Sequence, residues 1–248
     1  MEGFARKELI KELKNTLLEL QGFKPTDVTT DQLEFGLTAM ASAFPFGTLP
    51  TGSIHEFISP TAACATATNG FVAGLLSTLM MNDKSCLWVS TKRSLFPLGL
   101  AYFGIAPHRI IFVDVQRDKD ALWVMEQALK CSVLGAVVAE LNEISFAQSQ
   151  RLQLAVEESR VTGFLHRKKL RSTNTLACVS RWSIRPVASQ VVDGLPGVGF
   201  PAWEVTLEKI RNGKAGSWTF GWRDGQFVSM QPQAQGWNAP LPKIQHYA

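Results

Sequence analysis

Residues 59–66 lie between a short apolar segment and a longer one, the place where nucleotide-binding proteins carry a phosphate-binding loop. That loop has the pattern G-x-x-x-x-G-K-[ST], because glycines expose backbone N–H groups to phosphates, lysine neutralises their charge and the hydroxyl binds Mg²⁺. Here Ser59 replaces the first glycine, Cys64 the second and Ala65 the lysine, so only Thr66 fits. The pattern predicts a degenerate loop with no nucleotide cofactor.

The replacements in this loop remove a large part of the free energy with which it would bind a nucleotide. Replacing the lysine by Ala65 removes a charge-assisted contact of about 1.5–3 kcal/mol. A residue other than glycine in left-handed backbone adds about 1–2 kcal/mol of strain. Together these losses weaken nucleotide affinity by a few orders of magnitude. We therefore expect that the chain is not an ATPase.

No other group of reactive side chains predicts a catalytic centre. The four histidines lack a ligand spacing such as H-E-x-x-H, so we expect no metal site. The four cysteines are scattered and lack C-x-x-C spacing, as expected of small buried side chains in a reducing cytoplasm. No Ser/His/Asp or Cys/His set stands out, and we expect no catalytic residues.

The composition is that of a globular protein: 248 residues, 46% hydrophobic and 19% charged, with a mean hydropathy of +0.03. This length suits one sizeable α/β domain with appendages. The apolar runs are far shorter than the roughly 20 residues of a membrane span. The charged N-terminus does not resemble an export signal, so we expect a cytoplasmic protein.

Basic residues gather in one part of the chain. The net charge of +4 and the pI of about 8.9 are mild, but the stretch from 160 to 185 holds seven basic residues and no acidic one. They are Arg160, Arg167, Lys168, Lys169, Arg171, Arg181 and Arg185. These residues are candidates for contact with nucleic-acid phosphates or with an acidic protein partner. A solvated basic loop is the third interpretation.

Strand and helix patterns alternate through the middle of the chain. Strands are predicted at 54–58, 86–90, 109–114 and 135–140, and helices at 66–81, 96–103, 119–131 and 146–160. After residue 160, strands with short connections are predicted at 163–166, 176–186, 203–211, 217–222 and 226–228. Asn-Gly at 212–213 and Asp-Gly at 224–225 are hairpin turn signals. The predicted fold class is α/β, a mostly parallel sheet flanked by helices with antiparallel strands added at the C-terminal side.

The N-terminal residues predict a separate element. Within residues 4–21, leucines three to four apart form one apolar stripe: Leu9, Leu13, Leu17 and Leu20. This amphipathic helix either docks on a partner or a neighbouring subunit, or packs on its own domain. The chain is thus divided into an N-terminal helix and connector (1–47), a domain (48–228) and a flexible C-terminal tail (229–248).

Several segments resemble known proteins. Residues 52–60, Gly-Ser-Ile-His-Glu-Phe-Ile-Ser-Pro, resemble the entry strand of RecA proteins, and residues 178–185, Cys-Val-Ser-Arg-Trp-Ser-Ile-Arg, resemble their late strand. A closer resemblance is to the RecA-like ImuA family, accessory proteins of an inducible mutagenesis cassette. It rests on residues 121–129, 135–140, 151–155, 163–165, 203–205 and 216–218, and it extends over about residues 48–228.

The resemblance implies a RecA-like core with further losses. Lys92 falls where RecA proteins carry the glutamate that activates the attacking water, and a cation cannot act as that base at neutral pH. Glu140 takes the place of the Walker B aspartate. About nine residues, 167–175, remain for the second DNA-binding loop, which argues against RecA-like strand exchange.

The function implied by the resemblance is that of a non-catalytic accessory or scaffold protein in the SOS response and in error-prone translesion DNA synthesis. Its expected partners are the RecA recombinase and a Y-family-like polymerase or adaptor, with single-stranded DNA and self-association as further candidates. One alternative is a SulA-like division inhibitor that binds FtsZ, although such inhibitors are typically shorter. Another is an ATP-dependent recombinase, which would have to bind ATP despite Ala65.

Overall fold

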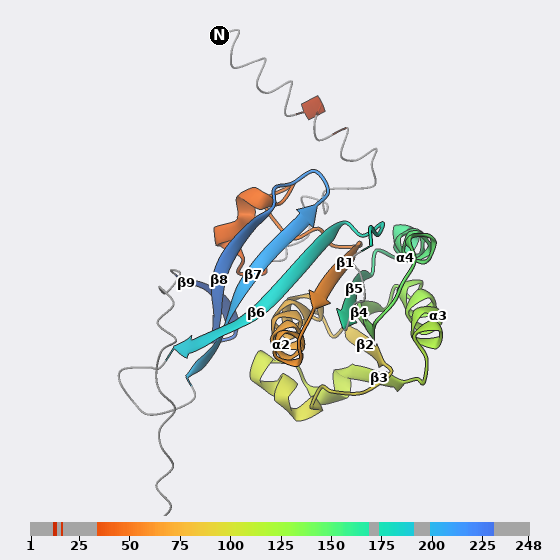
Figure 1. Cartoon of the computed structure of the whole chain (residues 1–248), viewed down its shortest axis with the longest axis horizontal. Helices are drawn as coiled ribbons and strands as arrows, with labels where there is room; N and C mark the ends of the chain where they lie inside the picture. The colour runs from red at the N-terminus through yellow and green to blue at the C-terminus, as the bar shows by residue number, and fades with distance from the viewer. Residues whose placement is uncertain (1–11, 14–15, 17–33, 169–173, 191–198, 231–248) are drawn as a thin grey trace, which may run out of the picture.

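The computed structural model describes Glu12, Leu13 and Thr16, and residues 34–168, 174–190 and 199–230. The described residues form one sheet with the strand order β3-β2-β4-β5-β1-β6-β7-β8-β9 (Figure 1). Its strands are β1 (Ile54–Ser59), β2 (Ser85–Ser90), β3 (Ile110–Asp114), β4 (Leu134–Leu141), β5 (Thr162–Lys168), β6 (Ser180–Gln190), β7 (Phe200–Ile210), β8 (Gly216–Arg223) and β9 (Gln226–Met230). The α-helices are α2 (Ala62–Leu79), α3 (Asp118–Leu129) and α4 (Phe146–Ser159), with 3-10 segments η1 (Thr38–Ala43), η2 (Pro97–Phe103) and η3 (Pro107–Arg109).

The sheet has a parallel part and an antiparallel part. From β3 to β6, neighbouring strands pair in parallel, whereas β6, β7, β8 and β9 pair antiparallel. This confirms the predicted fold class of a mostly parallel α/β sheet with an antiparallel addition at its C-terminal side.

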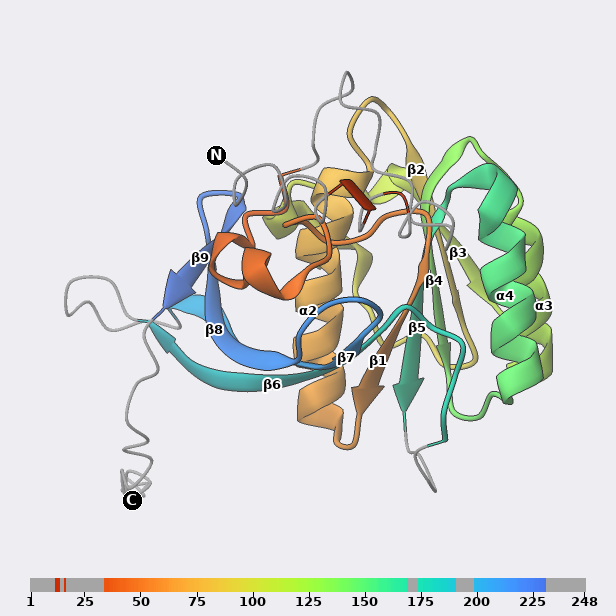
Figure 2. The same ribbon diagram turned by 90° about the horizontal axis from the view of Figure 1, so that it is seen from above.

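Helices cover both faces of the parallel part, because such strands are apolar on both sides. Figure 2 shows α2 on one face and α3 with α4 on the other. Along β4, Ala136 and Val138 pack into the core around α2, while Val137 and Ala139 pack into the core beneath α3 and α4. Length and composition alone would allow α2 to cross a membrane, but 67% of it is buried, as in a core helix.

A capping box begins α4, and the predicted Asp-Gly hairpin turn is confirmed. The hydroxyl of Ser145 accepts from the backbone N–H of Gln148 (3.2 Å), and the Gln148 side chain accepts from the backbone N–H of Ser145 (2.8 Å), which makes the capping box of α4. Asp224 and Gly225, between β8 and β9, both have positive φ angles of 50° and 76°. This is the backbone of a two-residue hairpin turn, for which Asp-Gly is favoured.

Several predicted boundaries were wrong. Helix α2 begins at Ala62, four residues before its predicted start at 66, and β6 covers Ser180–Gln190 instead of 176–186. The helix predicted at 96–103 is the 3-10 segment η2. Ser229 and Met230 belong to β9 and not to the tail, whose other residues, 231–248, lie outside the described part of the chain.

Residues 35–47 belong to the domain core and not to a connector. Phe35, Leu37, Met40 and Phe44 are buried in the core around α2, next to β8 and β9. These side chains have neither helical nor strand periodicity over a long window, so the sequence did not identify them as core residues.

The predicted N-terminal helix is described at three residues. Glu12, Leu13 and Thr16 are helical, and the hydroxyl of Thr16 donates to the carbonyl of Glu12 (3.0 Å). The side chain of Leu13 is 60% exposed. The other residues of the leucine stripe, Leu9, Leu17 and Leu20, lie outside the described residues.

The contact between β4 and the end of α2 gives a test of this packing. A Cβ added at Gly135 would lie 2.4 Å from the carbonyl oxygen of Leu79, which is backbone and cannot turn away. We expect Gly135→Ala to lower the free energy of unfolding in urea by about 1–3 kcal/mol. Gly99→Ala is the matched control, because a Cβ at Gly99 meets nothing within 4 Å, and it should change stability by less than about 0.5 kcal/mol. Equal midpoints for the two variants would contradict the close approach.

Candidate functional site

The turn at the predicted position of the degenerate phosphate-binding loop lies at the C-terminal end of β1 and is very short. Only Pro60 and Thr61 separate β1 from α2, and Ala62 and Ala63, which would belong to a phosphate-binding loop, are already helical. The hydroxyl of Thr61 caps α2 by accepting from the backbone N–H of Cys64 (3.2 Å). In a phosphate-binding loop, such N–H groups point at the ligand. Here a side chain of the protein occupies one of them.

The hydroxyl groups beside this turn form hydrogen bonds to other groups of the protein. Thr66, the residue that fits the motif, donates its hydroxyl to the carbonyl of Ala62 in its own helix (3.1 Å). The hydroxyl of Ser59 lies 2.9 Å from that of Thr68 and 2.9 Å from Nε2 of His166. Ser59, Thr68 and His166 are all buried, so water does not replace these contacts.

Glu140, at the Walker B position near the end of β4, is paired with a lysine from the neighbouring strand. Nζ of Lys168 lies 2.5 Å from one carboxylate oxygen of Glu140, and the indole N–H of Trp88 donates to the other (3.1 Å). Lys168 also donates to the hydroxyl of Ser94 (3.1 Å). The Glu140 side chain is only 3% exposed. A lysine ammonium therefore stands beside the carboxylate that would otherwise serve Mg²⁺.

A second buried carboxylate lies on the opposite face of the sheet. Glu56 of β1 accepts from NH1 of Arg167 (2.7 Å) and from Nε of Arg181 (2.7 Å), on the strands that flank β1. Arg167 is fully buried and Glu56 is 1% exposed. Removing one partner of such a buried cluster typically costs about 3–5 kcal/mol, because the remaining charge is left unpaired. Glu56 thus fixes two cations inside the domain.

These contacts correct part of the predicted basic surface. Arg167, Lys168 and Arg181 were candidates for contact with DNA or a partner, but each is bound to an internal carboxylate and Arg167 has no exposed surface. Arg160, at the end of α4, and Arg185, on β6, are exposed. Lys169 and Arg171 lie outside the described residues.

The remaining predicted site residue, Lys92, follows the end of β2 by two residues and is exposed. Sequence reasoning missed the carboxylate Glu56, the hydroxyl of Thr68 and the histidine His166 as members of the site. Each stands in a strand or helix that also carries a run of apolar residues. A charged or polar residue in such a run is a signal for a buried partner, because an unpaired one is costly.

A buried hydrogen-bonded chain runs through the start of β1. Nε2 of His55 lies 2.7 Å from the carbonyl of Pro50, which can only accept, so Nε2 carries the proton. Nδ1 then accepts from the hydroxyl of Ser180 (2.6 Å), which in turn accepts from the indole N–H of Trp182 (2.6 Å). Burial lowers the pKa of His55 from 6.5 to about 4. Burial, together with the charge of Lys168, lowers the pKa of His166 from 6.5 to about 3.

These two neutral histidines predict a loss of stability in mild acid. Below about pH 6.5 the unfolded chain binds protons that the folded protein excludes, so stability falls from there toward the folded pKa values of about 4 and about 3. Between pH 7.5 and 5.0 we expect each histidine to lower the free energy of unfolding by about 2 kcal/mol. Urea titrations at both pH values measure this loss. His55→Gln or His166→Gln should halve it, and an unchanged loss in both variants would show that these side chains are not its source.

Comparison with known proteins agrees with this architecture, although no family model matches the chain. Protein ImuA of Caulobacter vibrioides, from strains NA1000 and CB 15, is 33% identical over 207 residues, covering 78% of this chain and 84% of the relative. The crystal structure of the RadB recombinase superposes with a TM-score of 0.56 at 15% identity, covering 81% of this chain and all of that one. The likeness to the RadB recombinase supports the RecA-like fold alone. The likeness to Protein ImuA, at this identity and coverage, shows that the chain belongs to the ImuA family.

Proposed function

We propose that this protein is a non-catalytic accessory factor of inducible, error-prone translesion DNA synthesis in the bacterial cytoplasm. It works by binding other proteins, namely the damage-response recombinase and a specialised polymerase or polymerase-like adaptor. Membership of the ImuA family and the RecA-like fold support the first part. Because a fold does not determine a function, the second part depends on the chemistry of the site.

The observation that carries the proposal is the self-capped start of α2. A nucleotide needs a loop of free N–H groups, but the chain turns from β1 into α2 within two residues and caps the helix with Thr61. To open the loop, the first turn of α2 would have to unwind. The pairing of Glu140 with Lys168 adds a second obstacle, because Mg²⁺ would have to displace a bound ammonium group.

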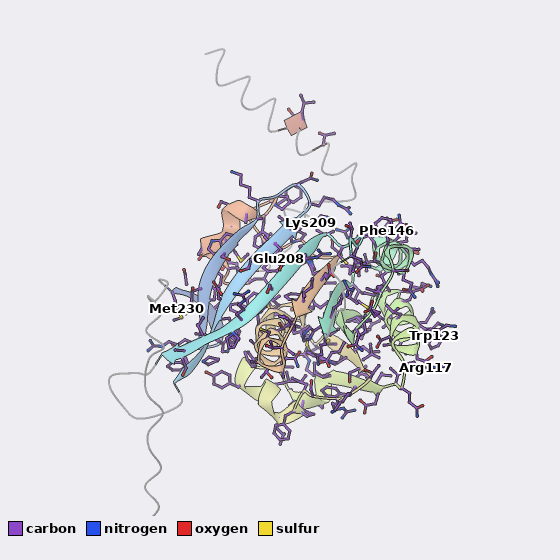
Figure 3. All side chains as sticks on the ribbon, viewed as in Figure 1. Arg117, Trp123, Phe146, Glu208, Lys209 and Met230 are labelled. Carbon is purple, nitrogen blue, oxygen red and sulfur yellow. The ribbon has the colours of Figure 1, made fainter. Side chains whose placement is uncertain are left out.

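Exposed apolar side chains favour a binding role. Trp123 of α3 is 63% exposed and Phe146 of α4 is 48% exposed, and both residues are labelled in Figure 3. Leu13 of the N-terminal helix is 60% exposed. A large aromatic or a leucine stripe on a helix is the kind of surface that docks in a partner's groove.

Direct contact with single-stranded DNA would be made by the exposed Arg160 and Arg185, with Lys169 and Arg171.

One prediction of this proposal concerns nucleotide binding. In isothermal titration calorimetry with Mg²⁺-ATP, we expect no saturable binding up to millimolar concentration, because the charge and the loop that hold phosphate are both missing. A RecA protein serves as the positive control in the same buffer. Saturation in the micromolar range would contradict the proposal and favour the alternative of an ATP-dependent recombinase.

The second prediction concerns partners. The tagged chain, purified from DNA-damaged cells after nuclease treatment, should retain the recombinase or a polymerase-type protein, as identified by mass spectrometry. Leu13→Glu should reduce recovery of the partner if the leucine stripe makes the contact. Asn15→Glu is the matched control, because it makes the same charge change off that stripe.

Two results would count against this proposal. Recovery of FtsZ with neither expected partner would favour a SulA-like division inhibitor. Loss of every partner after nuclease treatment would mean that DNA, and not a protein contact, holds the complex together.

A further inference from the structure

A groove of about 810 Å³ lies beside α2, between its N-terminal half, η2 and the adjoining ends of β6 and β7. Its α2 side consists of small residues, among them Ala63, Ala67 and Gly70. Its walls include the rings of Phe96, Tyr102 and Trp203. Figure 1 shows η2 next to α2, with β6 and β7 on the other side. The volume is in the range of sites that bind small molecules or peptide segments.

The groove is free of charge. None of the described residues that line it is acidic or basic, in a chain with 19% charged residues. Asn69, also in the lining, is 7% exposed, and its Oδ1 is buried with no partner among the described residues. A buried acceptor without a donor is unfavourable. The groove therefore suits an uncharged, apolar occupant that also brings an N–H or O–H group.

One segment of this chain has that chemistry. Residues 231–242 read Gln-Pro-Gln-Ala-Gln-Gly-Trp-Asn-Ala-Pro-Leu-Pro and contain no charged residue, and the first charge beyond them is Lys243. Proline-rich segments dock in aromatic grooves because they lose little conformational freedom on binding. Trp237 combines a large apolar surface with an indole N–H donor.

This segment also starts close enough to the groove. Met230, labelled in Figure 3, pairs with Thr219, and Thr219 pairs with Glu204, the neighbour of Trp203. Two strand spacings, about 10 Å in all, therefore separate the start of the segment from the strand that carries Trp203. The seven residues from 231 to 237 can extend over roughly 23 Å. Trp237 can thus reach the groove of its own chain.

We propose that the groove formed by α2, η2, β6 and β7 is a docking site for residues 231–242 of the same chain, with Trp237 against its aromatic walls and near Asn69. The match rests on the absence of charge in both, the unpaired acceptor in the groove and the length of chain beyond Met230.

Photo-cross-linking in the full-length chain tests this contact. Asn238, next to Trp237, is replaced by p-benzoylphenylalanine, and the cross-linked peptides are mapped by mass spectrometry. We expect links to residues of α2 or η2. The labelled chain is irradiated together with an excess of ¹⁵N-labelled, probe-free chain, so that a link within one chain gives light peptides only.

Two exposed residues of the same 3-10 region provide a matched pair. Phe96 lines the groove and Leu98 does not, and they are 68% and 66% exposed, so neither substitution disturbs the core. Phe96→Glu should lower the yield of the groove cross-link about tenfold or more, because an apolar contact does not tolerate an unpaired carboxylate. Leu98→Glu should leave the yield unchanged.

Three results would overturn the proposal. They are links that map away from the groove, equal yields in the Phe96→Glu and Leu98→Glu variants, or links to the ¹⁵N-labelled chain. The last result would assign the groove to a second copy. None of these results bears on whether the protein binds ATP or a polymerase.

Discussion

Polar groups at the C-terminal ends of buried parallel strands need partners, and in this protein other groups of the chain supply most of them, although Nδ1 of His166 and NH2 of Arg167 are buried without one among the described residues. In nucleotide-binding proteins of comparable layout, the phosphates, Mg²⁺ and water fulfil this requirement. Here the Thr61 hydroxyl caps α2, Ser59 bonds to Thr68 and His166, and Lys168 neutralises Glu140. These contacts involve the residues at the predicted degenerate loop, Ser59 and Thr61, and at the Walker B position, Glu140.

The same requirement decides where the basic residues go. Successive side chains of a strand point to opposite faces of the sheet. In β5, Lys168 therefore lies on the face covered by α2, and Arg167 lies on the face covered by α4. Each of the two cations is paired with a carboxylate on its own face: Lys168 with Glu140 and Arg167 with Glu56. Buried carboxylates are tolerated only with a cation close by. The cations at this end of β5 are therefore part of the domain's internal electrostatics.

The sequence predicted the order of the elements and the place of the degenerate loop, because continuous apolar strands and amphipathic helices have distinct periods. It did not predict the burial of Arg167, since arginine is seldom buried and the run 167–171 looks like a surface loop. Only the pairing of β1 with β5 and β6 brings Arg167 and Arg181 to Glu56. The contribution of Phe35 and Met40 to the core was missed for a similar reason, because their packing depends on β8 and β9 far along the chain.

The cap of α2 by Thr61 and the pairing of Glu140 with Lys168 bear on whether a nucleotide could change the conformation of the protein. A nucleotide shifts a protein between two states only by binding one of them more tightly. Under the proposed function, the capped loop and the acidic residue that already carries its cation leave ATP no such differential contact. The proposed function then needs no ATP-driven change in the core around α2, and partners would meet preformed surfaces. Under the proposed function, segments outside that core, such as the predicted N-terminal helix, are then the candidates for controlling partner binding.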